Sequence, residues 1–276
     1  MERILIGFDG SPASVSALTW VAERASRGPA TVSLTSVVSR GTAEHSEAMR
    51  VLTDADAFLR ERAPGTTVRV MSPAGGVVDV LLRSREQADL VVVGVDPGHP
   101  LRSALAGPLP LRISTRSRVP VVMVPPGWVD VGDPVTVGID SDDSSDDAVS
   151  FGADEAFQSD RSLRLVHAWL MPTPTFTGAT ARMASPEAVV EGHRMTLDAA
   201  TRAASLRHPA LDVCAELHRE GASTALLRYA PESSMLVIGT HRRGVVAGSL
   251  WGSVAHDVLW RAECPIVVVP SASRER

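Results

Sequence analysis

Short apolar runs alternate along the chain with longer stretches in which apolar residues recur at helical spacing. In the C-terminal half the runs are VTVGI, LRLVHAW, LDVCAEL, MLVIG and PIVVVP, separated by stretches such as DDAVSFGADEAF, AVVEGHRMTLDAATRAASL and ASTALLRYA. Runs rich in β-branched residues with little polar alternation predict strands that are buried on both faces. The intervening stretches are long enough for crossovers between parallel strands. The pattern predicts parallel sheets covered by helices.

The same pattern occurs twice in the chain, which predicts an internal duplication. Three pairs of segments align without gaps, the first at a shift of 131 residues and the others at 145: 3–25 with 134–156, 75–94 with 220–239, and 119–125 with 264–270. The second copy is longer by about 14 residues, and residues 172–186 (PTPTFTGATARMASP) have the Pro, Thr and Gly content of an irregular loop.

The two copies predict two domains of the same fold. Residues 125–134 (PPGWVDVGDP) are rich in Pro and Gly, as linkers are. We therefore expect domain 1 at 1–127 and domain 2 at 133–276. The predicted fold class is α/β, with two tandem doubly wound, Rossmann-like parallel sheets that have helices on both faces. In such sheets ligands bind at the carboxyl ends of the strands, where the strand order reverses.

Composition narrows the function classes. The net charge of -5 and the pI near 5.9 argue against nucleic acid or an anionic membrane as a partner. No apolar run approaches the roughly 20 residues of a membrane span, and the N-terminus lacks the pattern of a secretory signal, so we expect a cytoplasmic protein. Cys214 and Cys264 are too few for a disulfide framework and are expected to be reduced, structural thiols.

All 27 basic residues are arginine. A bound phosphate would therefore be held by backbone N–H groups, hydroxyls, arginine or a metal, and the lysine of a Walker A loop is excluded.

Acidic residues close the first strand of each copy. Asp9 and Asp140 each allow two interpretations. Each is either a helix cap or a carboxylate that faces the ligand crevice and accepts hydrogen bonds from a base or ribose. The acid-rich run at 141–147 is better explained as a solvated first helical turn than as a cation site, so no metal site is predicted. His167 is expected at the edge of the core.

A glycine-rich loop follows the fourth strand of the second copy, at 239–254 (GTHRRGVVAGSLWGSV). Glycines let a backbone approach a ligand closely, and the next helix should begin near Ser253 with free N–H groups and a positive dipole end. The loop therefore predicts an anion cradle that needs no lysine.

The sequence resembles the universal stress protein family in its tandem form. The resemblance rests on ILIGFDGSPAS and VTVGIDSDDSS, LVHAW, LVVVG and LVIG, GSV, and VPVVMVP and CPIVVVP, and it covers both halves. The ATP-binding branch of that family has Gly, two residues, Gly, nine residues, Gly, then Ser or Thr. This chain has Gly239, Arg242, Gly252 and Ser253 at that spacing.

The resemblance implies a set of nucleotide contacts in domain 2. Arg242 replaces a glycine, and its guanidinium could either fill the phosphate space or donate a bidentate fork to a phosphate. The residues implied for the base, ribose and phosphates are Ile139, Asp140, Ala168, Ile238, Gly239, Arg242, Gly252, Ser253 and Val254.

The matching positions of domain 1 are Asp9, Gly94 and Gly107, but Pro97 stands at the second glycine and Pro108 at the serine. Proline at the helix start removes both an N–H and a hydroxyl, so this site is expected to be degenerate. We expect at most one occupied site per chain.

The leading hypothesis for function is a stress-responsive, ATP-binding regulatory protein. Its nucleotide, with or without Mg²⁺, would be held mainly by domain 2 and would change conformation or assembly. No catalytic constellation stands out, so we expect no enzyme activity beyond slow ATP hydrolysis. The alternative is a structural or interaction module of the same family that binds no nucleotide, and an adenylyl-transferring enzyme is disfavoured. The family resemblance also implies antiparallel pairing of the two fifth strands, an intrachain pseudo-dimer, and a homodimer of chains stays open.

Overall fold

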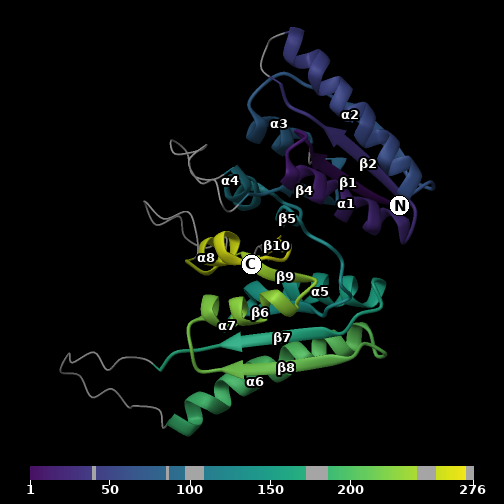
Figure 1. Cartoon of the computed structure of the whole chain (residues 1–276). Coiled ribbons are helices and arrows are strands. Elements are labelled where there is room, and N and C mark those ends of the chain that lie inside the picture. The colour runs from purple at the N-terminus through teal and green to yellow at the C-terminus, as the bar shows by residue number, and fades with distance from the viewer. Residues whose placement is uncertain (39–41, 85–86, 97–108, 172–185, 241–252, 272–276) are drawn as a thin grey trace, which may run out of the picture.

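The computed structural model describes residues 1–38, 42–84, 87–96, 109–171, 186–240 and 253–271. Strands and helices alternate through both halves (Figure 1). The elements of the N-terminal half are β1 (Glu2–Gly7), α1 (Pro12–Ser26), β2 (Ala30–Thr35), α2 (Thr42–Arg62), β3 (Thr67–Met71), α3 (Val77–Ser84), β4 (Leu90–Gly94), α4 (Leu109–Arg116) and β5 (Val121–Val124).

The C-terminal half repeats this order of strands and helices, and it also has a short 3-10 turn before α5 and another after α7. Its elements are β6 (Val135–Ile139), η3 (Asp143–Ser145), α5 (Asp146–Gln158), β7 (Leu163–Ala168), α6 (Pro186–Arg207), β8 (Val213–His218), α7 (Ala222–Tyr229), η4 (Ala230–Glu232), β9 (Met235–Thr240), α8 (Ser253–Arg261) and β10 (Ile266–Pro270). Residues 125–134, between β5 and β6, contain neither helix nor strand.

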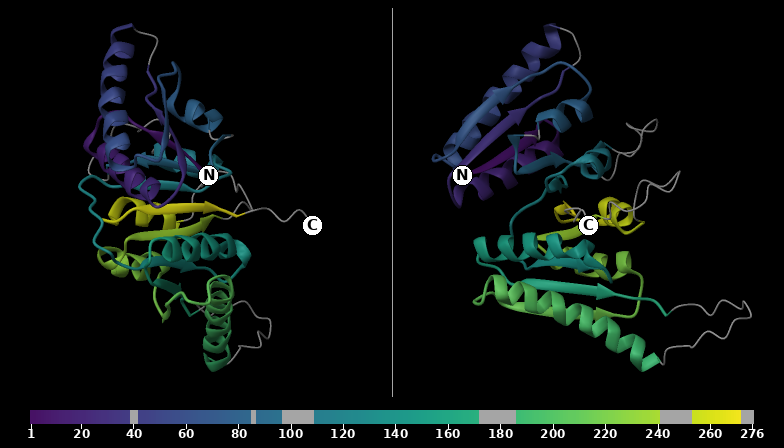
Figure 2. Two further views of the ribbon diagram at one scale, coloured as in Figure 1. Left: turned by 90° about the vertical axis from the view of Figure 1, so that its right-hand side faces the viewer. Right: turned by 180° about the vertical axis from the view of Figure 1, so that it is seen from behind.

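The strands form one ten-stranded sheet in the order β3-β2-β1-β4-β5-β10-β9-β6-β7-β8. Within each half all pairs are parallel, while β5 and β10 pair antiparallel, with Ile266 opposite Met123 and Val268 opposite Val121. The two halves therefore meet at these strands, in the middle of the sheet (Figures 1 and 2). The strand order reverses between β1 and β4 in one half and between β6 and β9 in the other.

Each face of the sheet carries one apolar core that runs through both halves. On one face α1, α2, α5 and α6 cover residues such as Ile6, Val122, Val137 and Leu165. On the other face, helices α3, α4, α7 and α8 cover a second cluster, whose members include Leu5, Leu81, Ile113, Val121, Leu226, Ile238, Leu259 and Val268. Because successive side chains of a strand point to opposite faces, apolar strands such as β5 supply both cores. Because side chains alternate between the two faces in this way, α4 and α8 pack against the same core, the second cluster.

The two outermost strands differ from the others in exposure. The sequence predicted strands buried on both faces, and β4, β5, β9 and β10 are nearly completely buried. In contrast, β3 alternates exposed and half-buried residues, and β8 is half-buried or exposed throughout. Both are sheet edges, where one neighbouring strand is missing and a helix covers only one face, so polar residues are tolerated.

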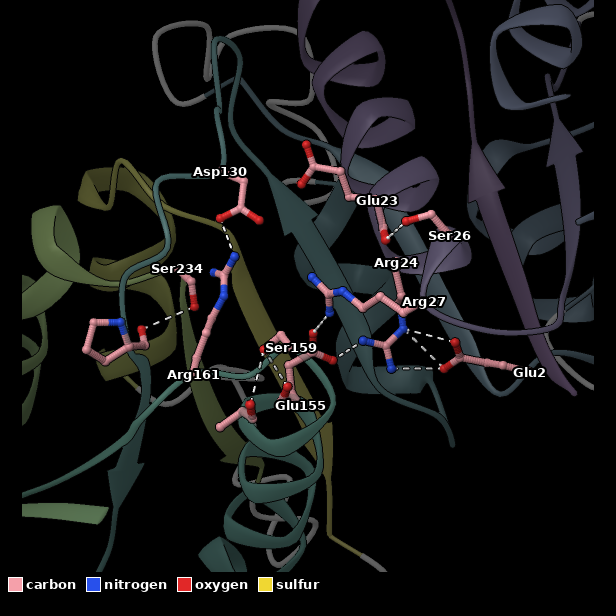
Figure 3. A network of polar contacts seen from close by, with 12 residues as sticks. Glu2, Glu23, Arg24, Ser26, Arg27, Asp130, Glu155, Ser159, Arg161 and Ser234 are labelled. Atoms are coloured by element: carbon pink, nitrogen blue, oxygen red, sulfur yellow. Dashed lines mark hydrogen bonds and ion pairs between the residues drawn. The ribbon is translucent and has the colours of Figure 1, made fainter. Parts of the chain in front are cut away.

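A network of ion pairs joins the two halves beside the sheet. Glu155 of α5 is 2% exposed. It accepts hydrogen bonds from Arg24 of α1 and from Arg27, which directly follows α1, and the distance between Arg27 Nη1 and Glu155 Oε1 is 2.6 Å. Arg24 also contacts Glu2, and Arg161 pairs with Asp130 of the linker (Figure 3). Buried charges of this kind must be paired to be tolerated, so the network constrains how the halves fit together.

Candidate functional site

A cavity in the C-terminal half opens at the carboxyl ends of its strands, where the strand order reverses. It has a volume of about 230 Å³ and reaches from β7, at Ala168, to β10, at Val268. This is the place where doubly wound sheets bind their ligands. The cavity is lined by Thr115, Gly138, Ile139, Asp140, Ser144, Ser145, Val166, Ala168, Ala222, Leu226, Ile238, Gly239, Thr240, Val254, Ala255 and Val268.

Six of the nine residues that the resemblance implied for domain 2 line this one cavity, namely Ile139, Asp140, Ala168, Ile238, Gly239 and Val254. A seventh, Ser253, is the first residue of α8. Helix α8 therefore begins where the glycine-rich loop predicted a helix start. Arg242 and Gly252 lie outside the described residues.

The walls of the cavity are apolar and belong to the shared core. Val166, Leu226 and Ile238 are 2%, 3% and 6% exposed, and they pack in the same cluster as Val268. Small residues, Ala168 and Ala222, leave the space between these walls open. A planar, largely apolar ring is the kind of group that such walls accommodate, with orientation set by a few polar groups at the rim.

Asp140 supplies one of those polar groups. Its carboxylate accepts a hydrogen bond from the N–H of Ser141, with 2.6 Å between Ser141 N and Oδ1, and the Asp140 N–H donates to the hydroxyl of Ser145 at 2.7 Å. The rest of the side chain is exposed at the cavity. Asp140 is not the N-cap of α5, a position taken by Ser145. The carboxylate therefore orders the turn and keeps acceptor capacity toward the cavity.

Asp9 occupies the equivalent place in domain 1 and is likewise not the helix cap. Its Oδ1 accepts from the N–H of Ser11 at 3.0 Å, and the N-cap of α1 is Ser11, whose hydroxyl accepts from Ser14 N. Partial desolvation would raise the pKa of Asp9, but the hydrogen bonds from Ser11 and Ser14 hold it below its ordinary value. Asp9 is therefore an ionised group of the turn.

Gly239 is needed for a close approach of two backbone segments. A Cβ at this position would lie 2.2 Å from the carbonyl oxygen of Ser144, so a side chain cannot be accommodated without moving the turn before α5. Gly94, at the same strand end in domain 1, is packed in the same way against Ala13. A Cβ at Gly94 would lie 2.3 Å from the carbonyl carbon of Ala13. These glycines have a packing role that the sequence did not reveal. Gly107 lies outside the described residues.

Behind the cavity, two histidines form a hydrogen-bonded pair. His167 is 1% exposed, and its Nδ1 lies 2.8 Å from the carbonyl oxygen of Ile139, while its Nε2 lies 2.8 Å from His193 Nδ1. A carbonyl only accepts, so Nδ1 of His167 donates to it, and Nε2 of His167 shares a hydrogen bond with His193 Nδ1. His167 thus lies at the core edge, as expected, and fixes the Ile139 carbonyl beneath the cavity.

We expect this pair to make stability sensitive to mildly acidic pH. Desolvation, with a smaller effect of His167, lowers the pKa of His193, which is stacked on Trp169. The unfolded chain then binds a proton at higher pH than the folded chain, so stability falls as the pH drops below the ordinary histidine value. Urea unfolding of the wild type between pH 7.5 and 5.5 should show a small loss that His193→Phe, which keeps the stack, does not show. Identical pH curves for the two proteins would contradict this coupling.

Other candidate chemistry from the sequence is structural. In the acid-rich run, Asp142 Oδ1 accepts from Ser144 N at 2.9 Å, and within the described ranges no cluster of three or more metal-ligating side chains occurs. Burial raises the pKa of the Cys264 thiol to about 12. The pKa of Cys214 is also raised, by desolvation and by the neighbouring Glu216 carboxylate. Neither thiol is activated as a nucleophile.

Several cavity residues were not identified from the sequence. Val166, Ala222 and Leu226 look like ordinary strand and helix residues, and only the packing of β7 and α7 in the fold shows that they face the cavity. Thr115 comes from α4, in the other half of the chain. Ser145 could have been found, because a serine five residues after the strand-ending aspartate occurs in both copies.

These observations define a class of protein, a tandem, doubly wound α/β architecture with a cavity at one reversal of strand order. The sequence profile of the universal stress protein family matches residues 1–125 and 133–270. The chain therefore belongs to the universal stress protein family, in tandem form.

Relatives of similar length support this assignment. A universal stress protein of Mycolicibacterium smegmatis is 28% identical over 96% of both chains, and one of Mycobacterium tuberculosis is 26% identical over 96% of this chain and 95% of its own. The solved structure of a universal stress protein from Archaeoglobus fulgidus matches with a TM-score of 0.73 at 16% identity, covering 99% of this chain and 97% of its own. In the described part of the chain, no helix has the length and apolarity to cross a membrane.

Proposed function

We propose that the chain is a stress-responsive regulatory protein that binds ATP in the cavity of domain 2. The observation that carries the proposal is the convergence of Ile139, Asp140, Ala168, Ile238, Gly239 and Val254 on one cavity at the reversal of strand order. These positions were selected from the sequence by their match to a nucleotide-binding motif. Their gathering around one space is what a functioning site requires.

The cavity divides into regions that suit the parts of a nucleotide. The apolar walls at Val166, Ala168 and Leu226 suit the faces of adenine. Asp140 can accept hydrogen bonds from ribose hydroxyls. Val254 and Ala255 lie in the first turn of α8, where unpaired backbone N–H groups and the helix dipole favour phosphate. Mg²⁺ would accompany the phosphates as in other nucleotide sites.

The nucleotide acts in this proposal as a ligand that changes conformation or assembly. The cavity walls belong to the core that continues through β5 and β10 into domain 1. A nucleotide bound in the cavity can therefore change the packing at the junction between the two domains. In the same proposal the β5–β10 contact makes the chain an intrachain pseudo-dimer, and pairing of two chains is a further level of assembly. Hydrolysis is expected to be far slower than the roughly 10 per second of a typical enzyme.

Titration calorimetry with ATP and Mg²⁺ tests the proposal. Wild type is expected to bind at a single site per chain, and Ala222→Trp, which fills the cavity from the start of α7, should weaken binding by at least about tenfold, or 1.4 kcal/mol. Thr224→Trp is the matched control, because Thr224 is exposed on the same helix and does not line the cavity.

No heat at millimolar ATP in the wild type would favour the second candidate, an interaction module without nucleotide. That candidate has its own support in the sequence, where Arg242, Pro97 and Pro108 replace residues of the binding motif.

A further inference from the structure

Thr115 lines the cavity of domain 2, although it belongs to domain 1. The antiparallel junction explains this placement. Val121, the first residue of β5, lies opposite Val268, and β10 runs parallel to β9, whose last residues Gly239 and Thr240 line the cavity. The start of β5 therefore lies at the cavity edge of domain 2. Helix α4, which leads into β5, must end at that edge.

The end of α4 is held firmly in this place. Ile113 is fully buried in the core cluster that contains the cavity walls Leu226 and Ile238. The turn after the helix is fixed by Ser117, whose hydroxyl donates to the carbonyl of Val119 at 2.7 Å and accepts from the Val119 N–H at 3.2 Å. Thr115, between these anchors, is exposed toward the cavity. Figure 1 shows α4 and α8 on the same side of the β5–β10 junction.

The duplication gives Thr115 a counterpart of very different size. At the shift of 145 residues that aligns 119–125 with 264–270, Thr115 corresponds to Trp260 of α8. The two-fold relation between the halves directs the end of α8 toward the strand ends of domain 1, as the end of α4 is directed toward those of domain 2. The small residue, Thr115, thus lines the site whose motif is nearly complete, and the duplication assigns the large residue, Trp260, to the site whose motif carries two prolines.

We infer that each domain's last helix forms a wall of the other domain's nucleotide site, and that the residue at this position decides which site stays open. Thr115 leaves the β10 end of the domain 2 cavity free for an adenine nucleotide, whereas Trp260 fills the corresponding end of the domain 1 site. Domain 1 is then a necessary part of the domain 2 site, and the difference between the two walls acts together with Pro97 and Pro108 to limit the chain to one nucleotide. This inference rests on the proposed function.

The test uses the full-length chain and three single variants, with titration of ATP and Mg²⁺ as the readout. Thr115→Trp should weaken ATP binding by at least tenfold, Thr115→Ser should bind as the wild type does, and Trp260→Thr should leave the affinity of the domain 2 site unchanged. Because Thr115 is exposed, Thr115→Trp should keep the wild-type urea midpoint, which separates a blocked site from a misfolded protein.

The outcomes separate the two proposals. If the wild type binds ATP and folded Thr115→Trp binds it equally well, the cross-domain wall is wrong and the proposed function stands. If the wild type binds no ATP, both fall. Weakened binding in Thr115→Trp together with unchanged binding in Trp260→Thr supports the inference. Loss of binding in both variants would show a general effect of the junction and would overturn the assignment of Thr115 to one site.

Discussion

Replacing Glu155 by alanine is expected to destabilise the folded chain by up to about 3–5 kcal/mol, because Arg24 and Arg27 lose their buried counter-charge and Arg24 keeps only Glu2, whose side chain is 34% exposed. The Arg24 side chain is 9% exposed and the Glu155 side chain 1%, so solvent cannot take over the lost contact. Arg27 is more exposed, at 29%, and can turn toward water. Urea unfolding followed by tryptophan fluorescence measures the loss.

The duplication provides a charge-swap control for this prediction. Arg24 and Glu155 are separated by 131 residues, the shift that aligns α1 with α5, so they are equivalent positions that meet across the junction. Arg24→Glu or Glu155→Arg alone would place like charges together and should destabilise strongly. The double swap restores opposite charges within the pair, but it also brings like charges next to Glu2 and Arg27, so it should recover only part of the loss. A Glu155→Ala protein with a stability within about 1 kcal/mol of wild type would contradict a buried, coupled pair.

The same carboxylate predicts a loss of stability in acid. Burial alone would raise the pKa of Glu155, but the guanidinium groups of Arg24 and Arg27 hold it below its ordinary value. The stability that Glu155 contributes is therefore complete above the ordinary glutamate pKa of about 4.3 and is lost as the pH falls through the lower value of the folded chain. Glu155→Gln should be less stable at neutral pH and should lose less on acidification below about pH 4.3.

Gly239→Ala is expected to destabilise the chain by roughly 1–3 kcal/mol or more, which is the usual cost of overpacking a buried site. It should also weaken ATP binding. The added Cβ would meet the Ser144 carbonyl at 2.2 Å, and backbone cannot yield as a flexible side chain does. Ser144 and Ser145 line the cavity, so the forced movement changes the site itself. Differential scanning calorimetry measures the first effect and ATP titration the second.

Two matched variants isolate these effects. Gly94→Ala makes the same clash in domain 1, with Ala13, and should cost comparable stability while leaving the affinity of domain 2 for ATP unchanged. Gly28→Ala adds a methyl where nothing lies within 4 Å, and its midpoint should stay near that of the wild type. If Gly239→Ala unfolds at the wild-type midpoint, the close packing of these turns is wrong.

The element order was predictable because each apolar run has the length and β-branched composition that favour a strand. VTVGI coincides with β6, and ASTALLRYA contains α7. The position of the candidate site was also predictable, since Asp140 directly follows β6 and Gly239 lies near the end of β9, and these two strands flank the reversal of strand order. The burial of a strand is less predictable, because LDVCAEL largely coincides with β8, an edge strand that is half-buried or exposed throughout.

Features that depend on the meeting of the two halves could not be predicted from local patterns. The Arg24–Glu155 pair joins residues on different helices whose contact exists only once β5 and β10 have paired. Thr115 enters the domain 2 cavity for the same reason. Local patterns report the surface a segment prefers to bury, and they carry no information about which distant segment covers it.

The central claim is that the cavity of domain 2 holds one adenine nucleotide per chain, and a crystal structure of the full chain grown with ATP and Mg²⁺ tests it most directly. The claim predicts density for the base between Ala168 and Leu226, with the phosphates at the start of α8 and no second nucleotide at Asp9 and Gly94. An empty domain 2 cavity at saturating ATP, or a nucleotide bound in domain 1 instead, would contradict it.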